Sequence, residues 1–123
     1  MPTVRITSPV RIEAAGNKPK LIEEHLGRAS SGHTGVSVAH MHSPGGWTEP
    51  GQTPEFEEFT LVLSGRLRLH SIDGEVDVTA GHGVVVPSGQ WVRYSTPDDD
   101  GAEYVSICIP AFTLETAHRD DEE

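Results

Sequence analysis

The sequence predicts an all-β fold, either a sandwich or a barrel, and three observations support this. From about residue 35 onward, short apolar or alternating runs are separated by Gly, Pro and Asp. Alternation with a period of two is typical of strands, whereas the spacing of an amphipathic helix is scarce here. Turn residues stand at every break between the runs, as they do in sandwiches and barrels.

The first part of the chain, residues 1–34, is expected to contribute edge strands. Residues 4–6 and 10–12 carry short β-prone runs, and residues 19–26 fit either a strand or one helical turn. We expect the barrel core to follow at residues 35–110.

The core is expected to be built from short strands. Residues 36–41 alternate, and residues 57–63 form an apolar run that ends at Ser64-Gly65. The later strands are expected at residues 84–86, 91–95 and 104–109. No linker or repeat interrupts them, so we expect one domain over residues 1–123, with residues 111–123 as a C-terminal tail.

A β-hairpin is expected in the middle of the core. Residues 66–70 alternate and lead to Asp73-Gly74, a dipeptide that favours a two-residue turn because it tolerates positive φ. Residues 75–78 alternate again and form the expected return strand.

Charge and composition exclude some classes of partner. The chain has 19 acidic and 9 basic residues and a net charge of −10, with no cluster of Lys or Arg. Such a surface repels nucleic acids and anionic membranes, so neither is expected as a partner. The sequence has no run long enough to cross a bilayer, no secretion signal and a single cysteine, Cys108, which together favour a cytoplasmic location.

Two stretches resemble sequence motifs of a known family. EFTLVLSG runs from Glu58 to Gly65, and GHGVVVPSG runs from Gly81 to Gly89. In this order and at this separation they resemble parts of the two motifs of the cupin superfamily. The phrases PEFEEF and WVRYSTP are similar to those of small bacterial cupins of unassigned function. The resemblance implies a double-stranded β-helix, the jelly-roll barrel of cupins, and a homodimer.

The resemblance also implies a metal site at defined positions. Cupins commonly hold a divalent metal with two histidines and a glutamate from the first motif and a histidine from the second. The matching positions in this chain are Gly51, Thr53, Glu58 and Val92. Only Glu58 is a residue of the expected kind, so the family's standard ligand set is degenerate here.

A different pair of histidines precedes the first motif. Period-two geometry places His40 and His42 on one face of a strand, with Val36 and Val38. We expect this face to point into the barrel, because the opposite face is small and mixed. His40, His42 and Glu58 would then bind a divalent metal (Fe, Mn, Ni or Zn) as a rearranged triad. Alternatively no metal is bound, and the histidines line the cavity or lie on the surface.

Other polar residues are candidates for catalysis and binding. If the loop after Trp47 begins a strand, Glu49 and Thr53 share the inward face. A carboxyl group in a desolvated cavity has a raised pKa, which suits proton transfer. We therefore predict Glu49, Glu58 and Tyr94 as catalytic residues. The predicted substrate pocket consists of His40, His42, Glu49, Thr53, Gln90 and Tyr94.

Three functions are compatible with these residues. The first is a cupin barrel that binds a small polar molecule in its cavity, with a degenerate metal site. The second is a metal-dependent oxygenase, isomerase or lyase that uses His40, His42 and Glu58. The third is a metal-free acid/base enzyme.

Overall fold

Strands form almost all the regular structure of residues 3–121, the part of the chain that the computed structural model describes. In chain order the elements are β1 (Val10–Ile12), β2 (Leu21–Leu26), β3 (Ser37–Ser43), β4 (Trp47–Thr48), β5 (Glu57–Ser71), β6 (Gly74–Thr79), β7 (Gly83–Val86), β8 (Val92–Thr96), β9 (Ala102–Ile109) and α1 (Leu114–Ala117). The all-β prediction is therefore confirmed. No helix among the described residues is long and apolar enough to cross a membrane.

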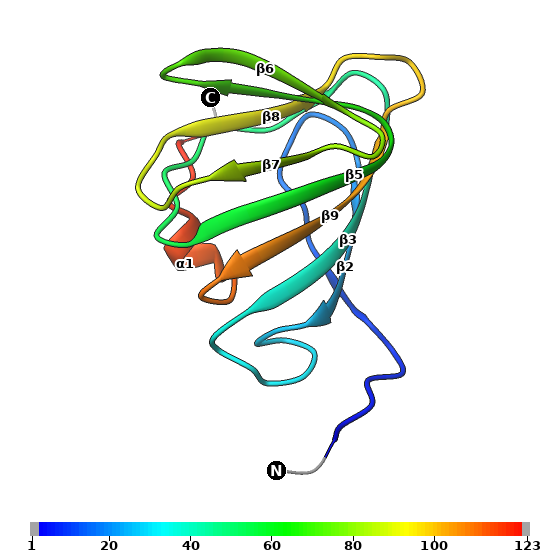
Figure 1. The fold of residues 1–123 in the computed structure, drawn as a ribbon, viewed down its shortest axis with the longest axis vertical. Helices are drawn as coiled ribbons and strands as arrows, with labels where there is room; N and C mark the ends of the chain where they lie inside the picture. Colours follow the sequence, from blue (N-terminus) through cyan, green and yellow to red (C-terminus); the bar gives the residue numbers. More distant parts are fainter. Residues whose placement is uncertain (1–2, 122–123) are drawn as a thin grey trace.

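The strands form one curled sheet that wraps around a central space (Figure 1). The hydrogen-bonded order is β1-β2-β3-β9-β5-β8-β4, and β6 and β7 also pair with β5. Every pairing is antiparallel. This arrangement is the jelly-roll barrel that the sequence motifs led us to expect.

Strand β5 joins the two halves of the barrel. Its first half pairs with β9 and β7, and its second half pairs with β6 and β8. The sequence predicted a break at Ser64-Gly65, but here the strand bends and continues. The register opposite β9 shifts between Val62 and Ser64, and Gly65 has a φ of 77°. A Cβ at Gly65 would lie 2.1 Å from the carbonyl oxygen of Gly101, so glycine is needed for this bend.

The predicted hairpin follows the bend, one residue earlier than expected. Ser71 pairs with Gly74, so the two loop residues are Ile72 and Asp73. Gly74 has a φ of 109°, which glycine adopts readily.

The two ends of the described chain differ from the expectations. No strand covers residues 4–6, and residues 19–26 contain strand β2 rather than a helical turn. Much of the predicted tail packs against the barrel, because Ala117 of α1 lies in a buried cluster with Phe56 and Cys108. The rest of both predictions, at residues 1–2 and 122–123, lies outside the described residues.

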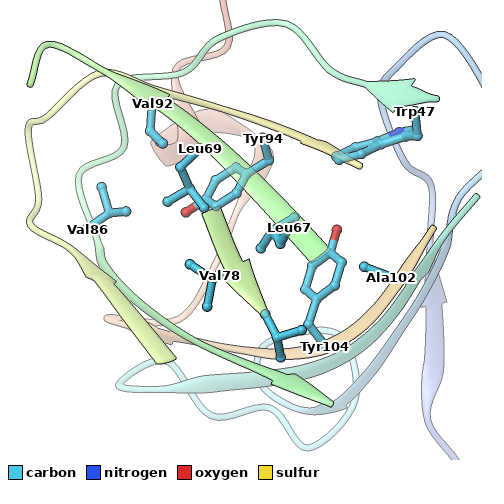
Figure 2. Close-up of a cluster of buried hydrophobic side chains, with 10 residues drawn as sticks. Trp47, Leu67, Leu69, Val78, Val86, Val92, Tyr94, Ala102 and Tyr104 are labelled. Carbon is cyan, nitrogen blue, oxygen red and sulfur yellow. The ribbon is translucent and has the colours of Figure 1, made fainter. Parts of the chain in front are cut away.

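The main core lies inside the barrel, where Leu67, Leu69, Val78, Val86 and Val92 meet (Figure 2). Tyr94 and Tyr104 point their rings into the same space from β8 and β9. The core therefore fills one part of the barrel, and the two tyrosines also line the cavity described next.

Candidate functional site

Strand β3 presents its histidines to the outside of the barrel. The side chains of β3 that line the cavity are Ser37, Ala39 and Met41. Alternation places His40 and His42 on the opposite face. The prediction that both imidazoles point inward is therefore wrong. The metal set of His40, His42 and Glu58 is wrong as well, because Glu58 lines the cavity on the other side of the sheet.

The error has a physical reason. Large side chains from other strands supply the bulk of the interior, including Trp47, Tyr94 and Tyr104. Small side chains on β3 are needed opposite them to leave space for a cavity. A small and mixed face therefore indicated the cavity side of this strand and not the solvent side.

The cavity has a volume of about 60 Å³. The cavity is lined by two basic side chains, Lys20 and Arg119, and by three acidic ones, Glu24, Glu49 and Glu58. It is thus a small space with an unusual density of ionisable groups.

Glu58, on β5, is the residue that the first motif identified. Its side chain is buried, and the hydroxyl of Tyr94 donates a hydrogen bond of 2.9 Å to its Oε1. Burial raises the pKa of Glu58, and the hydrogen bond from Tyr94 opposes that rise. Burial together with the charge of Glu58 also raises the pKa of Tyr94, so Tyr94 acts here as a donor.

Glu49 lies in the loop after β4 and is also buried. Burial raises the pKa of Glu49 from 4.5 to about 7, against the opposing charges of Lys20 and Arg119. Within the described part of the chain, the causes of this pKa include no hydrogen bond. Glu49 is therefore a carboxyl group that faces the cavity and can gain or lose a proton near neutral pH.

Two cations that the sequence reasoning missed balance these carboxyl groups. The Nζ atom of Lys20 lies 4.1 Å from the ring centroid of Trp47, which holds it at the cavity. The Nε atom of Arg119 is buried and has no hydrogen-bond partner among the described residues. Arg119 itself lines the cavity, so its guanidinium group contributes positive charge beside the two carboxyl groups.

Glu24 lines the cavity too, but its carboxylate already has partners. Its Oε2 accepts hydrogen bonds from the backbone N–H groups of Ala29 and Ser30 and from the Ser30 hydroxyl. Glu24 thus holds the loop that follows β2.

Besides His40 and His42, two more predicted pocket residues, Thr53 and Gln90, do not line the cavity. Gln52 lines it instead, because its backbone bridges to Val92 and Arg119. The predicted alternation of Glu49 and Thr53 fails because residues 49–56 form no regular strand. Glu49, Glu58 and Tyr94 do come together, as expected, and their catalytic roles stay predictions.

The family's metal site does not fit this interior. Among residues 3–121, no histidine lines the cavity. A Cβ added at Gly51 would lie 2.3 Å from the ring of Trp91, so a histidine there would clash. Trp91 is held in place by a hydrogen bond of 2.9 Å from its Nε1 to Asp120. The cavity carboxyl groups of Glu49 and Glu58 have raised pKa values, and a carboxyl group binds metal poorly while it is protonated.

The histidines of β3 meet a different carboxylate outside the barrel. Glu103 on β9 lies opposite His42 in the register. Its Oε2 is 2.6 Å from Nε2 of His40 and 3.3 Å from Nε2 of His42. The hydrogen bond from His40 lowers the pKa of Glu103. One ligand atom from each residue lies within 4.8 Å of the others, so this group could hold a metal ion.

Comparison with known proteins agrees with the fold. The structure is similar to oxalate decarboxylase from Bacillus subtilis, with a TM-score of 0.76 and 17% identity, over 97% of this chain and 33% of that chain. It is similar to a predicted oxalate decarboxylase from Thermotoga maritima, with a TM-score of 0.71 and 18% identity, over 87% of this chain and 99% of that chain. The polyketide cyclase RemF from Streptomyces resistomycificus matches with a TM-score of 0.69 and 16% identity, over 96% of this chain and 90% of that chain.

In sequence, the chain is 40% identical over 99 residues to a protein named endoribonuclease YbeY from Myxococcus xanthus. The match covers 80% of this chain but only 34% of that protein's length. A family model described as "Cupin domain" matches residues 39–108. That match spans both motifs and most of the barrel, and the chain therefore belongs to the cupin domain family.

Proposed function

We propose that this cupin domain binds a small polar molecule in its cavity. The observation that carries the proposal is the lining of the cavity, where the basic side chains of Lys20 and Arg119 lie together with the buried carboxyl groups of Glu49 and Glu58.

The chemistry of the lining suggests the class of ligand. Arg119 and Lys20 favour an anionic or carbonyl oxygen, and Glu49 and Glu58 favour a hydroxyl group or a protonated acid. A cavity of about 60 Å³ favours a small ligand. Small carboxylic acids and hydroxy acids meet both conditions.

The experiment is a thermal-denaturation screen with small carboxylic and hydroxy acids. A binding acid at 100 times its Kd should stabilise the protein by about 2.7 kcal/mol. Glu49→Gln and Arg119→Gln should reduce this stabilisation, and His42→Gln, outside the barrel, should leave it unchanged. A hit that depends on His42 and not on Arg119 would contradict the proposal.

Acid/base catalysis in the same cavity is a second candidate, and the pKa of about 7 for Glu49 favours it. A general base works best when its pKa is near the working pH. In this reaction Glu49 would remove a proton from carbon next to the ligand's carbonyl group. Glu58 and Tyr94 would hold the carbonyl or hydroxyl oxygen.

NMR of each binding acid in D₂O separates the two candidates. A catalytic Glu49 predicts exchange of the α-hydrogen for deuterium, and Glu49→Gln should abolish this exchange while some binding survives. Binding without exchange for every acid would leave the binding function and remove the enzymatic one.

The metal-dependent enzyme with ligands His40, His42 and Glu58 is not proposed again, because these side chains lie on opposite sides of the sheet. The activity in the name of the Myxococcus xanthus relative is not proposed either, because the match covers only 34% of that protein. The homodimer and the cytoplasmic location stay predictions. Sedimentation of the purified chain would check the dimer.

A further inference from the structure

The outer face of the sheet carries a second cluster of polar groups, separate from the cavity. His40 and His42 extend from β3, and Glu103 extends from the neighbouring strand β9. Glu23 on β2 is the cross-strand neighbour of His40 on the other side. Ile22 and Glu24 of β2 line the cavity, so Glu23 points outward like the histidines.

The distances within this cluster are close to those of a metal site. Two ligands of a tetrahedral zinc ion lie about 3.3 Å apart, because each bond is about 2.0–2.2 Å long. Nε2 of His42 and Oε2 of Glu103 are already 3.3 Å apart. Nε2 of His40 and Oε2 of Glu103 are 2.6 Å apart, so this contact must open by less than about 1 Å. The ligand nitrogens of the two histidines lie within 4.8 Å of each other.

The cluster is also accessible to solvent, and its Glu103 carboxylate is not paired with a Lys or Arg of the described residues. The side chains of His40 and Glu103 are each 30% exposed, and that of His42 is 57% exposed. Within residues 3–121, the histidines are the basic side chains that contact the Glu103 carboxylate, and no Lys or Arg does so. His42 borders an open groove lined in part by Lys20, Pro44 and Asp100, through which a hydrated ion can approach.

We propose that His40, His42 and Glu103 bind one divalent transition metal ion on the outside of the barrel, with Glu23 in reach as a fourth ligand. Two imidazoles and one or two carboxylates suit Zn²⁺, Ni²⁺, Co²⁺ or Cu²⁺ rather than Mg²⁺ or Ca²⁺. Directly opposed side chains on neighbouring strands have Cβ atoms about 4.5–5.5 Å apart, which brings Glu23 within range of the ion.

Such an ion would tie together β2, β3 and β9 and would have no contact with the cavity ligand. The site therefore does not depend on the proposed function, and metal binding and acid binding should be lost in different variants.

The experiment is titration calorimetry of the full chain, without a histidine tag, with Zn²⁺ and with Ni²⁺. We expect one equivalent to bind to the native protein. Glu103→Gln and His42→Ala should each weaken binding at least tenfold, and Glu23→Gln should weaken it less. The metal should raise the denaturation temperature of the native protein and not that of Glu103→Gln.

Two control variants make the result specific. His25→Ala removes an exposed histidine of β2 that is not in the cluster, and Glu58→Gln changes the cavity. Both should bind metal like the native chain. The proposal is overturned if no metal binds up to 1 mM (on the order of the weakest specific sites), or if Glu58→Gln abolishes binding while Glu103→Gln and His42→Ala do not.

Discussion

Glu49 and Glu103 are the same kind of side chain in opposite surroundings. Glu49 faces the cavity, and burial raises its pKa to about 7. Glu103 lies on the outer face, and the hydrogen bond from His40 lowers its pKa. Inside the barrel a carboxyl group can exchange a proton near neutral pH, whereas outside it is held as an anion. The two faces of the same sheet therefore carry carboxyl groups with opposite pKa shifts.

The largest effect expected from this difference is on stability as a function of pH. Glu49 has a higher pKa in the folded protein than its usual 4.5, so the folded state binds more protons than the unfolded state between pH 4.5 and about 7. Stability should therefore fall as pH rises through this window, by about 3 kcal/mol from Glu49 alone. The raised pKa of Glu58 acts in the same direction.

Urea denaturation at several pH values between 4.5 and 8 measures this slope. Glu49→Gln should flatten it, because it removes the titrating group. Glu103 has a lowered pKa, so its contribution is present above pH 4.5 and is lost only below that pH. Glu103→Gln should therefore leave the slope above pH 4.5 unchanged, and an equal effect of the two variants would refute the comparison.

A smaller effect is expected from placing the same polar residue on the two faces of β3. Met41 lines the cavity and packs against the core, while His42 lies outside. Met41→Gln buries an amide and loses packing, which should cost about 2 kcal/mol. His42→Gln should change the free energy of unfolding by less than about 0.5 kcal/mol. Chemical denaturation of both variants checks this, and the reverse order would mean that the strand faces are assigned wrongly.

The contact between Gly51 and Trp91 tests whether there is room for a side chain at position 51. A Cβ at this position would lie 2.3 Å from the Trp91 ring, so Gly51→Ala should cost about 1–2 kcal/mol through overpacking. Gly35 is the control, because a Cβ there meets no atom within 4 Å. Thermal denaturation should show a loss of stability for Gly51→Ala and none for Gly35→Ala. Equal stabilities would mean that Trp91 moves freely and that a histidine could be accommodated.

The smallest effect is expected for the hydrogen bond between Tyr94 and Glu58. Tyr94→Phe should cost about 1 kcal/mol, and it should raise the pKa of Glu58 further, because this bond now opposes the effect of burial. Tyr104→Phe also loses a buried hydrogen bond, of 2.8 Å to Ser43, but that bond involves no carboxyl group. Only Tyr94→Phe should therefore extend the pH range over which stability falls. Titration of the carboxyl groups by NMR measures the pKa of Glu58. An unchanged pKa in Tyr94→Phe would contradict this prediction.

Much of the fold could be read from local patterns. Glu58 was identified by its motif, and Tyr94 by its alternation with Val92 along β8. Arg119 was missed because its segment was expected to be a tail, yet it packs beside the cavity. Glu103 was missed because it meets His40 from 63 positions away along the chain. Nothing local to either residue marks such a contact.

The sequence by itself determined that the chain is all-β, where most strands lie and which motifs make it a cupin. These features depend on alternation and turn chemistry, which act between neighbours. Only the tertiary structure decided which face of β3 points inward. A period of two defines two faces without saying which is the inner one, and that choice is made when distant strands close the barrel and their large side chains fill it. The same closure separated the buried carboxyl groups from the histidines of β3, which lie on the opposite face of the sheet.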